Sequence, residues 1–152
     1  WYEHKEIGYN YRMSNIVAGI GRAQLKYANE HRDGKEKIYR RYEHGFKNLP
    51  VKMNPYEENT KPNFWLSCML IDKECSVDPM HVIKVLSDNN IEARPIWKPM
   101  HMQPLFAEND FISAFEKPVD EEIFARGLCL PSDIKMTEEE QDYVIEVIRS
   151  CF

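Results

Sequence analysis

The sequence lacks the features that mark several large classes of protein. None of its apolar runs approaches the roughly 20 residues that a membrane-spanning helix needs, and none has the layout of a signal peptide. The GxSxG, Walker A, GxGxxG and HExxH motifs are also missing, so no short motif identifies a reaction. The 152 residues begin with Trp1 rather than with methionine, and we expect them to be part of a longer chain.

Cysteines are few and do not form a metal-binding pattern. Cys68, Cys75, Cys129 and Cys151 are widely separated, with no CxxC spacing and no accompanying pair of histidines. A metal site is therefore not expected. We interpret the four side chains as reduced, mostly buried thiols of a cytoplasmic protein.

Positive charge is scarce in the last third of the sequence. Residues 1–106 carry 16 basic and 13 acidic side chains, whereas residues 107–152 carry 4 and 12, and the whole chain has a formal charge of −5. This balance argues against a nucleic-acid-binding domain, which is normally strongly basic. It leaves room for a local anion site in the first two thirds of the chain.

Apolar periodicity predicts one α+β domain over residues 1–152, with a sheet of about three mostly antiparallel strands covered by helices and preceded by a long N-terminal helix. Ser14, Asp78 and Thr137 are expected N-caps of helices, because each precedes a helical pattern. Asp33-Gly34 is expected to bend or break the first helix. The expected strands are 64–71, 91–96 and 128–131.

Two segments carry the residue types of a binding site. In residues 8–14, a glycine, an amide, two phenols and a guanidinium come just before a helix, so Asn10 and Arg12 could hold a phosphate at its N-terminus. The alternative is that this segment serves only for capping and aromatic packing. In residues 94–104, three prolines stiffen a loop that carries Arg94, Trp97, Lys98 and His101. The alternative there is that the histidine is simply packed or solvated.

Both segments resemble sequence motifs of a known family. Residues 8–16, followed by Ala18, Gln24 and Leu25, closely resemble a signature of the DegT/DnrJ/StrS family of pyridoxal-phosphate-dependent sugar aminotransferases. Residues 93–104 resemble the family's proline-rich loop, which ends in His-x-Gln-Pro, and residues 127–132 resemble its closing strand. The resemblance covers essentially the whole chain and is greatest to enzymes that aminate nucleotide-linked 4-keto-6-deoxy sugars for polysaccharide or glycan assembly.

The resemblance implies a fold and a role for each segment. Family members have the aspartate-aminotransferase fold, in which a large cofactor domain with the Schiff-base lysine is followed by a small C-terminal α+β domain, and the chain resembles the second part. Asn10 would then reach the cofactor phosphate of the partner subunit in a homodimer, with Arg12 beside it. Contact with the sugar-nucleotide substrate is implied for His101 and, less directly, for Trp97, Lys98 and Arg94.

No lysine of this sequence has the context of the family's Schiff-base lysine, so we expect no catalytic residue here and no turnover by the chain alone. The intact protein is expected to be a homodimeric aminotransferase that uses pyridoxal phosphate and moves an amino group, from glutamate, to a keto sugar on a nucleoside diphosphate. Nucleic acid and membrane are not expected partners. Two alternatives stay open: a non-catalytic regulatory or binding member of the family, and an unrelated α+β interaction module.

Overall fold

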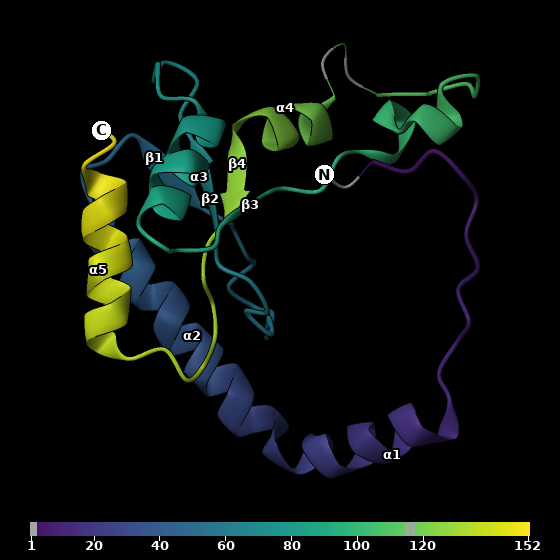
Figure 1. Cartoon of the computed structure of the whole chain (residues 1–152), viewed down its shortest axis with the longest axis horizontal. Coiled ribbons are helices and arrows are strands. Elements are labelled where there is room, and N and C mark those ends of the chain that lie inside the picture. The colour runs from purple at the N-terminus through teal and green to yellow at the C-terminus, as the bar shows by residue number, and fades with distance from the viewer. Residues whose placement is uncertain (1–2, 115, 117) are drawn as a thin grey trace.

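A computed structural model describes residues 3–114, 116 and 118–152 of the chain. Its centre is a four-stranded antiparallel sheet in the order β1-β2-β4-β3, with helices packed around it (Figure 1). The strands are β1 (Val51–Met53), β2 (Cys68–Ile71), β3 (Arg94–Pro95) and β4 (Gly127–Cys129). The helices are α1 (Asn15–Gln24), α2 (Ala28–Gly45), α3 (Pro79–Asp88), α4 (Val119–Arg126) and α5 (Glu138–Arg149), with 3-10 turns η1 (Leu25–Tyr27), η2 (Met100–Met102) and η3 (Pro104–Phe106).

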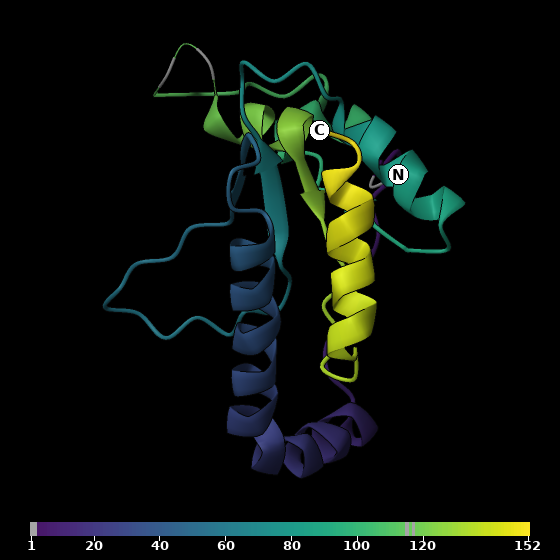
Figure 2. The same ribbon diagram turned by 90° about the vertical axis from the view of Figure 1, so that its left-hand side faces the viewer.

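The core lies on one face of the two central strands. Met69 of β2 is the cross-strand partner of Leu128 of β4, and both are almost fully buried. The side chains of a strand alternate between its faces, so Ile71 and Leu130 fall on the same side. Helices α2, α3 and α5 cover this side, with α2 and α5 running side by side (Figure 2). These helices contribute Ile38, Tyr42, Val82, Leu86, Val144, Ile145, Val147 and Ile148 to the core, and Phe46 joins them directly after α2.

The opposite face of the sheet carries Cys68, Cys129 and Arg94, which are in register across β2, β4 and β3. Helix α4 contacts β2 and β4 and leads directly into β4. Gly127 lies at the junction of the two elements and has no room for a side chain, because a Cβ atom there would lie 2.5 Å from the Ile96 Cγ1 atom. A side chain at this position would therefore push the proline-rich loop away from the sheet.

The helix starts follow the sequence signals. Ser14 Oγ accepts a hydrogen bond from the backbone N–H of Val17 at 3.3 Å, and the Asp78 carboxylate accepts one from Met80 at 3.0 Å. Thr137 forms a reciprocal capping box with its partner three residues on. All three predicted N-caps are confirmed, since each depends on local backbone geometry alone.

The predicted bend at Asp33–Gly34 is wrong, because Gly34 lies inside the continuous helix α2 and the chain turns at η1 instead. The glycine serves packing: a Cβ atom there would lie 3.2 Å from Ile134 Cγ2 in the loop before α5. The sheet also has a fourth strand, β1, beyond the three expected. With only three residues, β1 shows no alternating pattern, and its pairing with β2 defines it.

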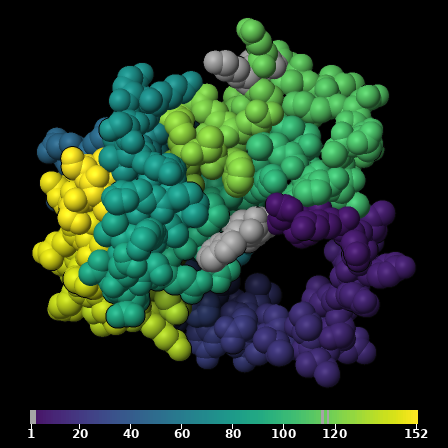
Figure 3. Space-filling model, turned by 45° about the horizontal axis from the view of Figure 1, so that its top comes forward, coloured from purple at the N-terminus to yellow at the C-terminus, as the bar shows by residue number. Residues whose placement is uncertain are grey.

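Residues 3–14 form an extended arm that leads to α1. Its first residues contact the loop around Gln103, whereas residues 6–14 and α1 stand away from the rest of the molecule. The space-filling view shows an open gap between them and the sheet with its helices (Figure 3). Helix α1 has no buried residue, and its apolar stripe is uncovered, with Ile16 77% and Ile20 60% exposed. Tyr9 of the arm is 83% exposed. This much uncovered apolar surface is typical of a segment that packs against another protein surface.

The buried phenol of Tyr42 gives a test of the core. Its hydroxyl donates to the Pro131 carbonyl at 2.9 Å, and burial raises the pKa of Tyr42 above its usual value. Tyr42→Phe would leave this carbonyl unpaired, so we expect a loss of about 1–3 kcal/mol in the free energy of unfolding, measured by urea denaturation. In the control Tyr143→Phe, the lost hydrogen bond comes from the 47% exposed Tyr143 and leaves only the half-buried Asn89 side chain, so we expect a change within about 0.5 kcal/mol. Equal losses in the two variants would contradict this role.

Candidate functional site

The arm presents Asn10 and Arg12 to the surroundings. Asn10 Oδ1 and the Asn10 carbonyl both accept from the Arg12 N–H, at 3.2 and 2.6 Å, so the backbone turns tightly here. Tyr11 and Arg12 have φ of 52° and 55°, in the left-handed region that few residues other than glycine adopt. Within the described residues, Asn10 Nδ2 makes no hydrogen bond and the Arg12 guanidinium no ion pair. Both donors are therefore available to an anion.

Gln103 connects the start of this arm to the proline-rich loop. Only 3% of the residue is exposed, and its Oε1 accepts from the His4 N–H at 2.8 Å. Its Nε2 donates to the Lys98 carbonyl at 3.2 Å. The His4 carbonyl in turn accepts from the Leu105 N–H at 3.2 Å. These contacts hold residues 3–5 against the loop.

Three of the predicted substrate residues have partners nearby. The Arg94 guanidinium donates twice to Glu92 Oε1, at 2.8 and 2.5 Å. The Trp97 ring lies 5.8 Å from the Trp65 ring, tilted by 31°, and remains 45% exposed. Lys98 Nζ lies 3.8 Å from the Glu3 carboxylate, which lies on the arm.

The environment of His101 fixes the orientation of its ring. Its Nε2 lies 2.8 Å from Glu121 Oε1, and because an ionised carboxylate only accepts, Nε2 carries the proton of this bond. Nδ1 lies 3.6 Å from Asp120 Oδ2, and the ring stacks on Phe111 with centroids 3.7 Å apart. The histidine is thus a largely buried side chain held by helix α4, and one edge still borders a cavity.

Three adjoining cavities run along the proline-rich loop. One of about 300 Å³ is lined by Arg94, Trp97 and Cys129 among others, and one of about 350 Å³ by Trp97 and Lys98. A third, of about 450 Å³, is lined by His101. The first two share Trp97, and the second and third share Met100 and Asp120. The structure therefore brings the four predicted substrate residues to one continuous surface, whereas Asn10 and Arg12 line none of these cavities.

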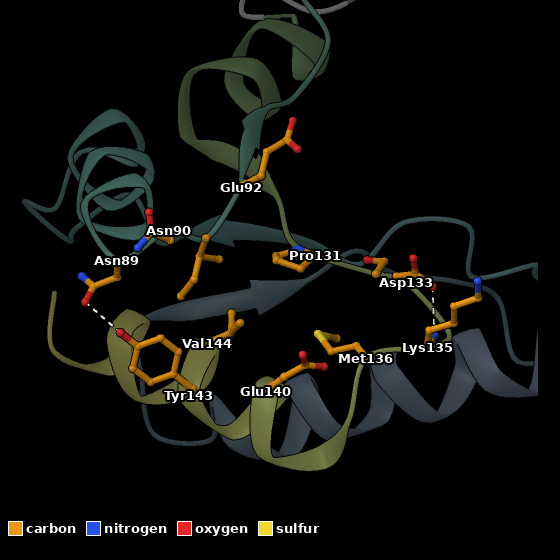
Figure 4. Close-up of a pocket in the computed structure, with 12 residues that line it drawn as sticks. Asn89, Asn90, Glu92, Pro131, Asp133, Lys135, Met136, Glu140, Tyr143 and Val144 are labelled. Atoms are coloured by element: carbon orange, nitrogen blue, oxygen red, sulfur yellow. Dashed lines mark hydrogen bonds between the residues drawn. The ribbon is translucent and has the colours of Figure 1, made fainter.

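A larger cavity of about 580 Å³ lies elsewhere, between the end of α3, the loop after β4 and α5 (Figure 4). The Tyr143 hydroxyl and the Asn89 side chain are joined across its rim by a hydrogen bond of 3.0 Å. None of the predicted site residues lines it. Glu92, Asp133 and Glu140 are among its lining residues, and they form no metal-binding group within the described residues.

Sequence reasoning missed three residues of this site. Gln103 stands in the His-x-Gln-Pro pattern, but only the folded chain shows that its amide holds the arm. Glu121 and Phe111 orient His101 from outside the loop, and no spacing in the sequence connects them to it. Glu121 reaches His101 from α4, and Phe111 reaches it from the segment after η3.

The fold is that of a small α+β domain whose exposed arm and stiff loop carry donors for anions. A family model for the DegT/DnrJ/EryC1/StrS aminotransferases matches residues 1–149, and the chain belongs to this family. It is 43% identical to the protein named "Putative pyridoxal phosphate-dependent aminotransferase EpsN" of Bacillus subtilis, over 99% of this chain and 39% of that protein. It is 31% identical to GDP-perosamine synthase of Escherichia coli O157:H7, over 99% of this chain and 40% of that protein.

Solved structures have the same fold. The PLP form of the protein named "Putative sugar aminotransferase Spr1654" from Streptococcus pneumoniae superposes with a TM-score of 0.79 at 22% identity, covering 92% of this chain and 36% of that one. DesI, solved in the presence of its TDP-sugar product, gives 0.77 at 21%, covering 91% and 36%. The chain thus spans about two fifths of the length of its relatives. No helix in the described ranges is both long and apolar enough to cross a membrane.

Pyridoxal phosphate is the cofactor expected of this family. The residues on the arm fit one part of it, its phosphate. Asn10 Nδ2 and the Arg12 guanidinium are exposed donors beside the N-terminus of α1, and such donors suit a phosphate dianion.

The contact between arm and loop can be tested at Gln103. Gln103→Leu keeps the volume of the side chain but removes the acceptor of the His4 N–H. We expect the His4 amide to exchange its hydrogen about tenfold faster, because one buried hydrogen bond is lost. Gln24→Leu in exposed α1 is the matched control and should leave this rate unchanged. Unaltered exchange at His4 in Gln103→Leu would show that the amide does not hold the arm.

Proposed function

We propose that this chain is the C-terminal part of a pyridoxal-phosphate-dependent aminotransferase that transfers an amino group, with glutamate as donor, to a keto sugar attached to a nucleoside diphosphate. The enzyme acts as a homodimer in the cytoplasm and serves the assembly of a polysaccharide or glycan. Two relatives support the substrate class: one is named GDP-perosamine synthase, and the other was solved with a TDP-sugar product.

The exposure of the arm is the observation on which this proposal rests. Its amide and guanidinium donors are open, and its aromatic residues and the apolar stripe of α1 are uncovered in the described part of the chain. Such a segment is suited to contribute to a site whose other half belongs to another surface. Asn10 would bind the phosphate of the cofactor held by the partner subunit, and Arg12 would add positive charge beside it.

The proline-rich loop would form one wall of the sugar-nucleotide site. Arg94 and Lys98 offer cationic donors for a diphosphate, and the exposed ring of Trp97 offers a flat apolar surface for a base or a sugar. Proline residues restrict the loop before the substrate arrives, so less entropy is lost on binding. His101 would contact the substrate at the third cavity, with its ring held by Glu121 and Phe111.

When bound, the cofactor supplies an electron sink for proton movement at the amine-bearing carbon. The residues of this chain would bind and orient rather than attack. Lys98 is the only lysine lining the three cavities within the described residues, and its ammonium pairs with Glu3. A protonated, ion-paired amine is a poor nucleophile. The catalytic lysine is therefore proposed to lie in another part of the protein.

The role of Asn10 has a direct test in the full-length enzyme. Asn10→Ala removes a hydrogen-bond donor to a charged phosphate, so we expect the Kd for pyridoxal phosphate to rise about 10- to 100-fold, measured by fluorescence titration. Asn59→Ala, in the exposed loop between β1 and β2, should leave the Kd unchanged. A wild-type Kd in Asn10→Ala would contradict the phosphate role and favour an arm that serves only for packing.

His101 tests the substrate site separately. His101→Gln should raise the KM for the nucleotide sugar about tenfold while the Kd for the cofactor stays unchanged, since the residue lies in the loop and not on the arm. His81→Gln, on an exposed face of α3, is the control. If the full-length protein binds the cofactor but no variant or condition yields an aminated sugar, it is a binding or regulatory member of the family.

A further inference from the structure

Cys68 and Cys129 face each other across the two central strands. They are register partners in the β2–β4 ladder, and their Sγ atoms lie 3.7 Å apart. Both side chains lie on the face opposite the core, because the adjacent Met69 and Leu128 point into it. Neither thiol has a role in the function proposed above, so that function does not explain why the two sulfurs lie so close together.

The backbone at this pair has the geometry that allows a covalent bond. The Leu130 N–H donates to the Ser67 carbonyl at 2.9 Å, which places the ladder hydrogen bond beside the cysteine pair and not within it. At such positions of an antiparallel ladder the Cα atoms lie about 4.5 Å apart and the side chains are at their closest. Disulfides span Cα separations of about 4.4–6.8 Å. Side-chain rotation can therefore bring the sulfurs together without a shift of either strand.

The two thiols differ in pKa and in access to a cavity, and these differences suit an oxidation in two steps. The pKa of Cys129 is lowered by its hydrogen bond with Cys68 and by the guanidinium of Arg94, which is its register partner on β3. The pKa of Cys68 is raised by its contact with Cys129 and by burial. Cys129 also lines the cavity of about 300 Å³ beside Trp65 and Trp97, so a small reagent has a route to it. Cys129 is then the attacking thiolate and Cys68 the resolving thiol.

We propose that Cys68 and Cys129 are a redox-modified pair that closes to an intramolecular disulfide when the protein meets hydrogen peroxide. The Cys129 thiolate attacks one peroxide oxygen, the O–O bond breaks, and Cys129 becomes a sulfenic acid with release of water. The Cys68 sulfur then attacks the sulfenic sulfur, the S–O bond breaks, and a second water leaves. Two thiols lose two electrons and two protons, and one peroxide is reduced to two waters.

The disulfide would cross-link the centre of the sheet beside the loop that carries Arg94 and Trp97. In the resting state both thiols are free, so the bond belongs to oxidising conditions and a dithiol reverses it. The proposal is independent of the aminotransferase function, because it rests on the strand register, the separation of the two sulfurs and the surroundings of Cys129.

The test uses the full-length protein, treated with hydrogen peroxide while folded, then alkylated and digested for mass spectrometry. We expect a peptide pair joined through Cys68 and Cys129, two hydrogens lighter than the separate peptides and released by dithiothreitol. Cys68→Ser and Cys129→Ser should each abolish it. Cys75→Ser and Cys151→Ser are the matched controls and should retain it, since neither thiol has a sulfur partner in the described chain.

Three results would overturn the proposal. The first is alkylation of both Cys68 and Cys129 after peroxide treatment of the wild-type protein. The second is accumulation of sulfinic acid at Cys129 with Cys68 still reduced, and the third is a cross-link that involves Cys75 or Cys151. The peptide map of the wild-type protein decides among these outcomes even if a serine variant fails to fold.

Discussion

The alternation of side chains along β2 and β4 is the constraint on which the remaining structure depends. Met69 and Leu128 occupy the face that α2, α3 and α5 bury, and burying side chains of this size contributes about 1.5–3 kcal/mol each. A shift of one residue in either strand would exchange the two faces. The same alternation therefore places Cys68, Cys129 and Arg94 on the other face, next to the cavities of the proline-rich loop.

The two parts of the chain, the sheet with its helices and the arm, are stabilised differently. The sheet and its helices have a continuous apolar core, whereas the arm is held mainly by the hydrogen bonds of His4 with the Gln103 side chain and the Leu105 N–H. A segment with so few contacts adopts a defined path most readily when another surface covers it. The uncovered aromatic and aliphatic side chains of the arm and α1 provide the area for such a surface. Such a covering surface is what the proposed homodimer would supply, with the arm completing the partner's phosphate site.

Features that depend on a few neighbouring residues could be predicted from the sequence. The caps at Ser14, Asp78 and Thr137 are local, and so is the loop stiffened by prolines at residues 95–104. The bend predicted at Asp33–Gly34 was wrong. The glycine is explained by close packing against Ile134, which is 100 residues away in sequence. Strand β1 was missed for the same reason: three residues show no periodicity, and only pairing with β2 makes them a strand.

The sequence by itself determined the family, the expected cofactor, the α+β class and the two segments that carry anion donors, because motifs and periodicity are written in consecutive residues. Only the tertiary structure decided that Gln103 joins the arm to the loop and that Glu121 with Phe111 orients His101. It also brought Cys68 within 3.7 Å of Cys129. These contacts join residues far apart in the chain, and packing of the sheet against its helices, rather than spacing in the sequence, sets them.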